Sequence, residues 1–280
     1  MRRAAAKIAR QLLRVRRHGG WLLLSLCALW LVRRFAPAEA LRSATDVGGN
    51  FLQAFVGIYG LVLAFAIFVT WTQQNDTQIA IEREANLVED LYRLLGWFDR
   101  WPGRDAARRL LAEYARNVPR VHADGSSTPD LPERELLEEL LGSLLGYRDL
   151  SPSEERLWPK ALDLSHELST AGEHRATCAA LRLPSGLKWF VILGGAASVA
   201  ILLMLRVEVL WVHAAFVALL TWAVVASVTI VLDLDDPYTG DFIVDWACFD
   251  EALQRIESLQ RIGSSGVSLE HRATPVSTVR

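Results

Sequence analysis

Four aspartates lie close together just after a long apolar run near the C-terminal end of the chain. The segment VLDLDDPYTGDF, residues 231–242, carries them as Asp233, Asp235, Asp236 and Asp241 around a Pro-Tyr-Thr-Gly turn. Calcium takes about six to eight oxygen ligands, and carboxylates with turn carbonyls are of that kind. Charges, proline and glycine also end an apolar helix well. The pattern therefore has two interpretations: a calcium site, or a solvated turn that redirects the chain under a membrane.

Two histidines with neighbouring glutamates are the other candidates for a metal site. His166 and His174 lie on one predicted helix, about 12 Å apart along its axis. That separation is too large for one metal ion without ligands from elsewhere, so surface positions are the simpler interpretation. The sequence contains no phosphate-binding loop and no GxGxxG, HExxH or GxSxG motif. We therefore do not expect an enzyme.

The composition combines the high hydrophobic content of a membrane protein with the charged content of a soluble one. The chain has 280 residues, of which 51% are hydrophobic and 22% are charged, and its net charge is −2. A balance this close to neutral does not favour a nucleic acid partner. The three cysteines, Cys27, Cys178 and Cys248, fit neither a disulfide framework nor a CxxC metal motif. Because apolar and charged residues fall in different stretches, we expect an all-α polytopic membrane protein with a helical soluble domain.

Three stretches are long and apolar enough to cross a bilayer as helices: residues 51–71, 187–205 and 209–232. Only three residues separate the last two, which predicts a tight transmembrane hairpin over residues 187–232. His213 lies inside the last stretch, and an ionisable group there is a functional hypothesis. It is also only a few residues from the hairpin turn, so a position at the membrane interface is the simpler interpretation.

A shorter apolar run, Trp21 to Val32, lies between basic residues within the region 1–50. It is short for a membrane span. Three interpretations remain open: a short span with snorkelling arginines, an interfacial helix, or a signal peptide cleaved after Ala38-Glu39-Ala40. Counted as a span, it gives about four transmembrane helices.

Basic residues set the predicted orientation. Residues 1–18 carry many Lys and Arg side chains and no acid, which places the N-terminus in the cytoplasm. Four spans then put residues 72–186, between the second and third spans, in the cytoplasm together with the C-terminal region 233–280. Lysine is rare among the basic residues, which is typical of a high-GC bacterial genome. We therefore expect a bacterial inner-membrane protein with both termini in the cytoplasm.

The soluble regions have helical patterns. Ile81, Ala85 and Val88 recur at helical spacing, and nothing breaks the chain before them, so the second span should continue into the cytoplasm. Ser151-Pro152-Ser153-Glu154 predicts a helix N-terminus. The C-terminal region should form an amphipathic helix after the acidic turn, followed by a flexible tail from Gly263-Ser264-Ser265-Gly266.

The second span, residues 51–71, carries two distinctive faces. The first holds small residues, which let a neighbouring helix approach closely: Gly57, Gly60 and Ala64. The second is apolar and consists of Leu61, Phe65 and Val69. If several copies turned the second face toward a common axis, these side chains would form apolar rings of the kind that gate a pore by dewetting. Lipid or intrasubunit packing is the alternative.

The chain resembles the bestrophin-like family and, more distantly, the bestrophins. The resemblance is carried by VGIYGLVLAFAIFVTW, IEREANLVEDLYRLL, HRATCAALRLPSGLKWF and LDDPYTG, in that order. It implies a homopentameric anion channel whose second helix lines the pore, with an apolar neck at Leu61, Phe65 and Val69. It also implies calcium binding at Asp233, Asp235, Asp236 and Asp241. Bestrophins usually carry an arginine after the neck; residues 70–75 read TWTQQN instead, which leaves the permeant ion open.

The leading functional hypothesis is an ion channel, anion-conducting by its resemblance to bestrophins, formed by a ring-shaped homo-oligomer in the lipid bilayer. The alternative is a non-conducting membrane scaffold or sensor. The large soluble block favours this alternative, because a bare pore does not need one. In that case its cytoplasmic helices would bind a protein partner.

Overall fold

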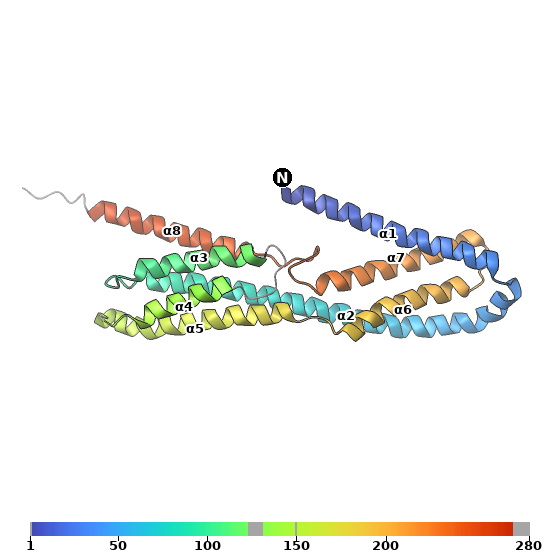
Figure 1. Ribbon diagram of the computed structural model, residues 1–280, viewed down its shortest axis with the longest axis horizontal. Helices are drawn as coiled ribbons and strands as arrows, with labels where there is room; N and C mark the ends of the chain where they lie inside the picture. Colours follow the sequence, from blue (N-terminus) through green and yellow to red (C-terminus); the bar gives the residue numbers. More distant parts are fainter. Residues whose placement is uncertain (1, 123–130, 149, 271–280) are drawn as a thin grey trace, which may run out of the picture. The chain divides into compact units, whose positions relative to one another are not determined.

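The computed structural model describes residues 2–122, 131–148 and 150–270, and its described part contains eight α-helices and no β-strand. The predicted all-α class is confirmed (Figure 1). The helices are α1 (Arg2–Phe35), α2 (Ala38–Leu95), α3 (Arg104–His122), α4 (Leu131–Leu145), α5 (Pro152–Ala180), α6 (Ser185–Met204), α7 (Leu210–Leu234) and α8 (Ala247–Glu270).

The chain divides into two compact units. Unit 1 consists of Met1–Thr72 and Arg182–Asp235, and unit 2 consists of Gln73–Leu181 and Asp236–Arg280. α2 contributes to both units, because it continues without a break from the predicted second span into the predicted soluble domain. No proline interrupts its sequence, so nothing prevents the backbone hydrogen bonds from continuing.

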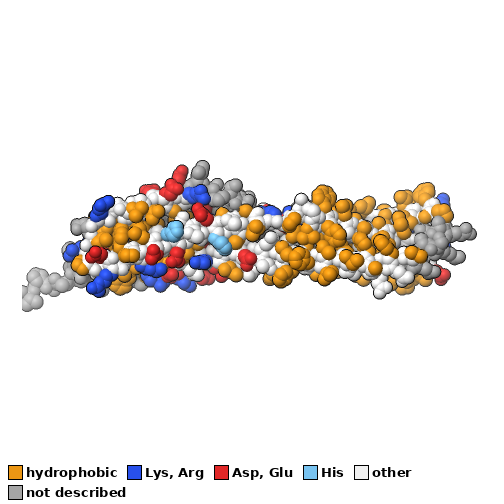
Figure 2. Space-filling view, turned by 90° about the horizontal axis from the view of Figure 1, so that it is seen from below, with side chains coloured by type: hydrophobic (Ala, Val, Ile, Leu, Met, Phe, Trp, Pro, Cys, Tyr) orange, Lys and Arg blue, Asp and Glu red, His pale blue; other side chains and the backbone are white. Residues whose placement is uncertain are grey.

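Unit 1 is a bundle of α1, the first part of α2, α6 and α7. Helix α1 lies alongside α7, and α6 packs against both (Figure 1). Three stretches of the described residues are long and apolar enough to cross a membrane; they fall within Val47–Leu95, Pro152–Met204 and Leu210–Leu234. In Figure 2, hydrophobic side chains cover the visible face of unit 1, whereas charged side chains gather on unit 2.

Helix α1 is longer than the apolar run from Trp21 to Val32. It is one uninterrupted helix of 34 residues, Arg2–Phe35. The basic residues on both sides of the run are good helix formers, so they extend the helix where hydropathy alone would end it. Leu29 is buried in the bundle, whereas Trp30 and Phe35 are exposed.

Unit 2 surrounds one large hydrophobic core, to which the second part of α2 contributes Ile81, Ala85 and Val88. The face predicted from helical spacing is therefore the buried one. Helices α3, α4, α5 and α8 supply the rest of the core. Four aromatic rings pack against one another in it: Phe98, Trp101, Tyr147 and Trp158.

Two helix boundaries in unit 2 have clear local causes. Ser151 caps α5, because its hydroxyl accepts from the backbone N–H of Glu154 while the Glu154 carboxylate accepts from the backbone N–H of Ser151. Pro152 follows in the first turn, as predicted. Helix α8 continues to Glu270, through the Gly263–Gly266 stretch in which we expected the flexible tail to begin. Residues 271–280, also part of the predicted tail, lie outside the described residues.

Candidate functional site

One face of α2 stays exposed along the membrane-length part of the helix. Leu61, Phe65 and Phe68 are 74%, 59% and 66% exposed. Gly57 and Gly60 lie on the same side, and no atom of another helix comes within 4 Å of a Cβ built on either glycine. Large apolar side chains and small residues thus share one wide face that no described part of this chain covers.

The three small residues predicted to pack against a neighbouring helix all lie on this face. Ala64 is exposed, as are Gly57 and Gly60. The helices of unit 1 pack against the opposite side of α2 instead. The close helix approach predicted for these three residues therefore stays a prediction, now about a second copy of the chain.

Val69 is less exposed than Leu61 and Phe65, the other two residues predicted to form the neck. It is partly buried and packs against a small apolar cluster formed by Ala66, Leu183, Val191 and Val231. Each step of four residues turns about 40° around an α-helix, so the third position has rotated toward the bundle. Phe68 occupies the exposed side at this level. The neck at Leu61, Phe65 and Val69 stays a prediction, and Phe68 is a position that strict four-residue spacing missed.

The buried face of α2 is fixed to α6 through Tyr59. The Tyr59 hydroxyl donates to the carbonyl oxygen of Val191 at 2.9 Å. A Cβ on Gly194 would lie 2.6 Å from the Tyr59 ring, and one on Gly195 would lie 2.9 Å from its hydroxyl oxygen. Glycine at both positions is what lets the ring lie directly on the α6 backbone, as expected for small residues in membrane helices. This contact sets which side of α2 remains exposed.

The aspartates of the acidic turn have separate roles in the described structure. The Asp235 carboxylate accepts from the backbone N–H of Leu183 at 2.5 Å and pairs with the ammonium of Lys188 at 2.5 Å. It thereby joins the end of α7 to the start of α6. A calcium ion at Asp235 would have to displace both partners, so this side chain does not fit the predicted metal site.

The aspartates that follow belong to unit 2. Asp236 accepts from the backbone N–H of Tyr238 at 3.1 Å, which is a turn-forming contact. Gly240 takes a positive φ of 93° in this turn.

The remaining two aspartates differ in exposure. Asp233 lies on α7 in unit 1 and is half-buried, whereas Asp241 is exposed. Within the described ranges, no group of three His, Cys, Asp or Glu residues could hold a metal ion. Calcium binding stays a prediction without support from this geometry.

Side chains of α2 hold the segment after the turn. Gln78 accepts from the backbone N–H of Asp245 at 2.8 Å and donates to its carbonyl oxygen at 3.1 Å. Gln74 donates to the carbonyl oxygen of Phe242. The amides that follow the neck candidates thus bind backbone of their own chain in unit 2.

A buried charged cluster in unit 2 was missed by the sequence analysis. The Arg175 guanidinium on α5 donates to Glu84 of α2 at 2.6 Å and to Glu133 of α4 at 2.8 Å. The Tyr114 hydroxyl of α3 donates to the other oxygen of Glu84 at 2.5 Å. Burial raises the pKa of Tyr114, and the Glu84 carboxylate raises it further. The one signal available was Glu84 itself, which interrupts the apolar face between Ile81 and Val88.

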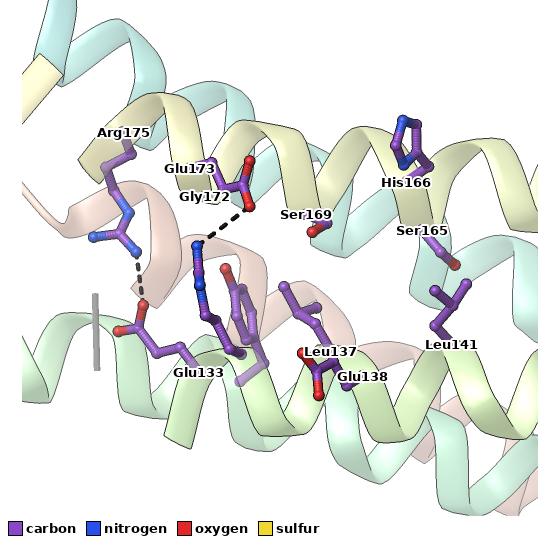
Figure 3. A pocket seen from close by; sticks show the side chains of 12 residues that line it. Glu133, Leu137, Glu138, Leu141, Ser165, His166, Ser169, Gly172, Glu173 and Arg175 are labelled. Atoms are coloured by element: carbon purple, nitrogen blue, oxygen red, sulfur yellow. Dashed lines mark hydrogen bonds and ion pairs between the residues drawn. The ribbon is translucent and has the colours of Figure 1, made fainter. Parts of the chain in front are cut away.

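A groove of about 200 Å³ between α4 and α5 lies beside this cluster (Figure 3). Ser165, Ser169 and Gly172 of α5 line one side of it, and Leu137 and Leu141 of α4 line the other. Arg134 and Glu173 pair across the groove at 3.4 Å.

The two histidines considered as metal ligands are not brought together. His166 lines the groove between α4 and α5, whereas the His174 ring lies 3.8 Å from the Cys178 sulfur. The arrangement gives no support for a metal site at either histidine.

The comparisons with known proteins found one matching family model and several similar solved structures. The model of the Bestrophin-like domain matches residues 19–247. A crystal structure of a bacterial bestrophin homologue from Klebsiella pneumoniae, a single-residue variant, has a TM-score of 0.69 at 12% identity and covers 87% of this chain and 99% of its own. A second, phased with zinc, has a TM-score of 0.62 at 12% identity and covers 88% and 97%. No curated protein sequence matches. The chain belongs to the Bestrophin-like family.

Proposed function

We propose that this chain forms a homo-oligomeric ion channel in which the exposed face of α2 lines the pore. The observation that carries the proposal is the division of that face. Gly57, Gly60 and Ala64 lie along one edge, where a neighbouring helix can approach closely. Leu61 and Phe65 lie beside them and would then point toward the axis of the assembly.

The chemistry of this face suits a gate. A constriction lined by Leu61, Phe65 and Phe68 excludes water when it is narrow, because no side chain in it forms hydrogen bonds. Widening by a small rotation of α2 would let water and ions pass. We assign anions as the permeant species from the resemblance to bestrophins, and five copies to the ring on the same ground.

Contacts between α1 and α7 support a fourth membrane span. His18 lies 3.4 Å from Thr229 near one end of α7, and Arg33 lies 3.0 Å from His213 near the other. The apolar run of α1 therefore lies antiparallel to α7 and extends along most of its length. Helix α7, Leu210–Leu234, is itself long enough to cross a bilayer. We infer that α1 crosses the membrane as well. Its membrane-crossing part is then about as long as that of α7, although its apolar run is short.

Four spans and the basic N-terminus define the orientation that we propose. The N-terminus, unit 2 and the C-terminus lie in the cytoplasm of a bacterium, and unit 1 lies in the inner membrane. Exposed tryptophans near both ends of the unit 1 helices fit the two interfaces of a bilayer; they are Trp21, Trp71 and Trp189 at one end and Trp30 and Trp211 at the other.

Planar bilayer recording tests the channel directly. Purified full-length protein should give unitary currents, and Phe65→Ala should change their size or open probability several-fold, because it removes one of the two phenylalanine side chains of the gate. Leu219→Ala is the matched control, because Leu219 is a similarly exposed apolar residue on α7. Currents that respond equally to both substitutions, or to neither, would place the pore elsewhere.

A non-conducting scaffold or sensor is the second candidate. Trp97, Leu145 and Leu181 of unit 2 are large apolar side chains that are more than half exposed. A partner protein would cover such side chains. The mass of the detergent-solubilised particle separates the two functions, because a monomer or dimer without currents fits the scaffold and not a ring-shaped pore.

A further inference from the structure

A pair of ionisable side chains, of which His213 is buried and Arg33 is half-buried, joins α1 to α7 at the hairpin end of unit 1. The Arg33 guanidinium lies 3.0 Å from Nδ1 of His213 and also donates to the carbonyl oxygen of Val207. The other ring nitrogen of His213, Nε2, lies 3.0 Å from the carbonyl oxygen of Leu202. His213 is only 1% exposed, although it lies close to the helix end. One imidazole thus connects α1, α6 and α7.

The contacts determine which form of the imidazole fits. A guanidinium has donors and no acceptor, so Nδ1 of His213 must accept the hydrogen bond from Arg33. The ring proton then belongs to Nε2, which donates to the Leu202 carbonyl. Only the neutral imidazole satisfies both contacts. A protonated ring would have a donor on each nitrogen, and it would place a second positive charge against Arg33.

Six other charged residues belong to this end of unit 1 by their position in the sequence. Arg34 follows Arg33 on α1, and the hairpin turn carries Arg206 and Glu208. The first turns of α2 contribute Glu39, Arg42 and Asp46 to the sequence of this end. Lys188 of α6 and Asp233 of α7 belong to the opposite ends of their helices. The two described partners of the His213 ring are a cation and a neutral carbonyl, and neither would stabilise an imidazolium.

We propose that Arg33 and His213 form a pH-sensitive latch between α1 and the α6–α7 hairpin. The latch is closed while His213 is neutral, and it opens when acid protonates the ring. In the orientation of the proposed function it faces the outside of the inner membrane, so an acidic exterior would release α1. This assignment of the side depends on the proposed function; the latch itself does not.

Local hydrogen–deuterium exchange of the full-length protein in detergent micelles tests the latch. The amides of Leu205, Arg206 and His213 are hydrogen-bonded around the pair. Corrected for intrinsic rates, they should exchange roughly tenfold faster at about pH 5 than at about pH 7.5, because protonation breaks a charge-assisted hydrogen bond. The lower pH lies about 1.5 units below the ordinary histidine pKa of about 6.5, because the Arg33 guanidinium opposes protonation of the ring.

Two variants assign the effect to His213. His213→Gln keeps an acceptor and a donor but cannot be protonated, so its exchange at the hairpin should not respond to pH. The control is His18→Gln, at the other end of the α1–α7 pair, which should respond like the wild type. If His213→Gln does not fold, Arg33→Gln replaces it, because a glutamine can accept from a protonated ring and the response should again disappear.

An unchanged response to pH in the folded variant would overturn the latch. An exchange rate in the wild type that does not change between the two pH values would overturn it equally. Neither measurement requires a current, so failure of the channel proposal leaves this test intact. Where currents are present, they should change with the pH of the outer compartment only; a response to the inner compartment alone would contradict the assigned side.

Discussion

The guanidinium of Arg175 lies 2.6 Å from the carboxylate of Glu84, and both side chains are completely buried in unit 2. Glu133 binds the same guanidinium at 2.8 Å, so three helices meet at one positive charge. The Arg175 guanidinium also lies 6.0 Å from the centre of the Trp246 ring, in the segment before α8. Arg175 of α5 therefore links the unit 2 part of α2 to α4 and to the segment before α8.

Removing this charge should destabilise unit 2 strongly. Arg175→Met leaves two carboxylates buried without their cation, which costs about 3 to 5 kcal/mol of unfolding free energy. Thermal unfolding in detergent measures the change. Arg134→Met is the control, since Arg134 pairs with Glu173 in an exposed position and should change stability by at most about 1 kcal/mol. Equal losses in the two variants would contradict the role given to Arg175.

Packing of Tyr59 on α6 gives a second prediction. A methyl group on Gly194 would stand 2.6 Å from the ring, so Gly194→Ala should destabilise unit 1 by about 1 to 3 kcal/mol through overpacking. Gly57→Ala should leave the stability of a single chain unchanged or slightly higher, because the site is open and alanine favours helix. Thermal unfolding of both variants in the same detergent provides the comparison. A neutral Gly194→Ala would show that Tyr59 does not fix the position of α2.

The capping box of α5 predicts a dependence on pH. Hydrogen bonding from the backbone N–H of Ser151 holds the pKa of Glu154 below its usual value. A carboxyl group with a lowered pKa in the folded state adds stability above its unfolded pKa, near 4.3, and loses it as the pH falls through the folded pKa. As the pH falls below about 4.5, the Glu154→Gln variant should therefore lose less stability than the wild type does. Acid titrations of the melting temperature that coincide for both proteins would contradict this.

The same cap can be tested at neutral pH. Ser151→Ala removes the hydroxyl that accepts from the Glu154 amide, which should cost about 1 kcal/mol. Ser169→Ala, further along α5, is the control, because Ser169 lies well inside the helix and away from its cap, so the change should cost little. Chemical denaturation of the two variants measures the difference, and similar midpoints would show that the cap adds little.

Much of the helical architecture could be predicted from local sequence. α2 passes from apolar to charged sequence without a helix breaker, and the Ser151–Glu154 pattern marks the start of α5. The extent of α1 could not be predicted, because the apolar run from Trp21 to Val32 ends well before the helix does. Hydropathy measures how readily a segment enters lipid, and it therefore marks only the apolar run. The arginines on both sides are polar but favour a helical backbone, so the helix continues past the run.

Contacts between distant residues set the limit of the sequence analysis. Arg175 and Glu84 are 91 positions apart, so no local pattern identifies them as partners. The pairing of Arg33 with His213 was missed for the same reason. At the candidate pore, four-residue spacing selected Val69, but the true helical repeat brings Phe68 to the exposed face. The turn aspartates resembled a calcium site by type, yet Asp235 is paired with Lys188 in the fold.

The most direct test of the account is whether water reaches the exposed face of α2 through a pore. The three native cysteines would be replaced by alanine, and Phe65→Cys would be added together with a matched Leu219→Cys control on α7. A membrane-impermeant, charged thiol reagent should then block the unitary currents of the first protein and leave those of the second unchanged. If Phe65→Cys reacts only with lipid-soluble reagents while currents continue, the face contacts acyl chains and the proposed pore is contradicted.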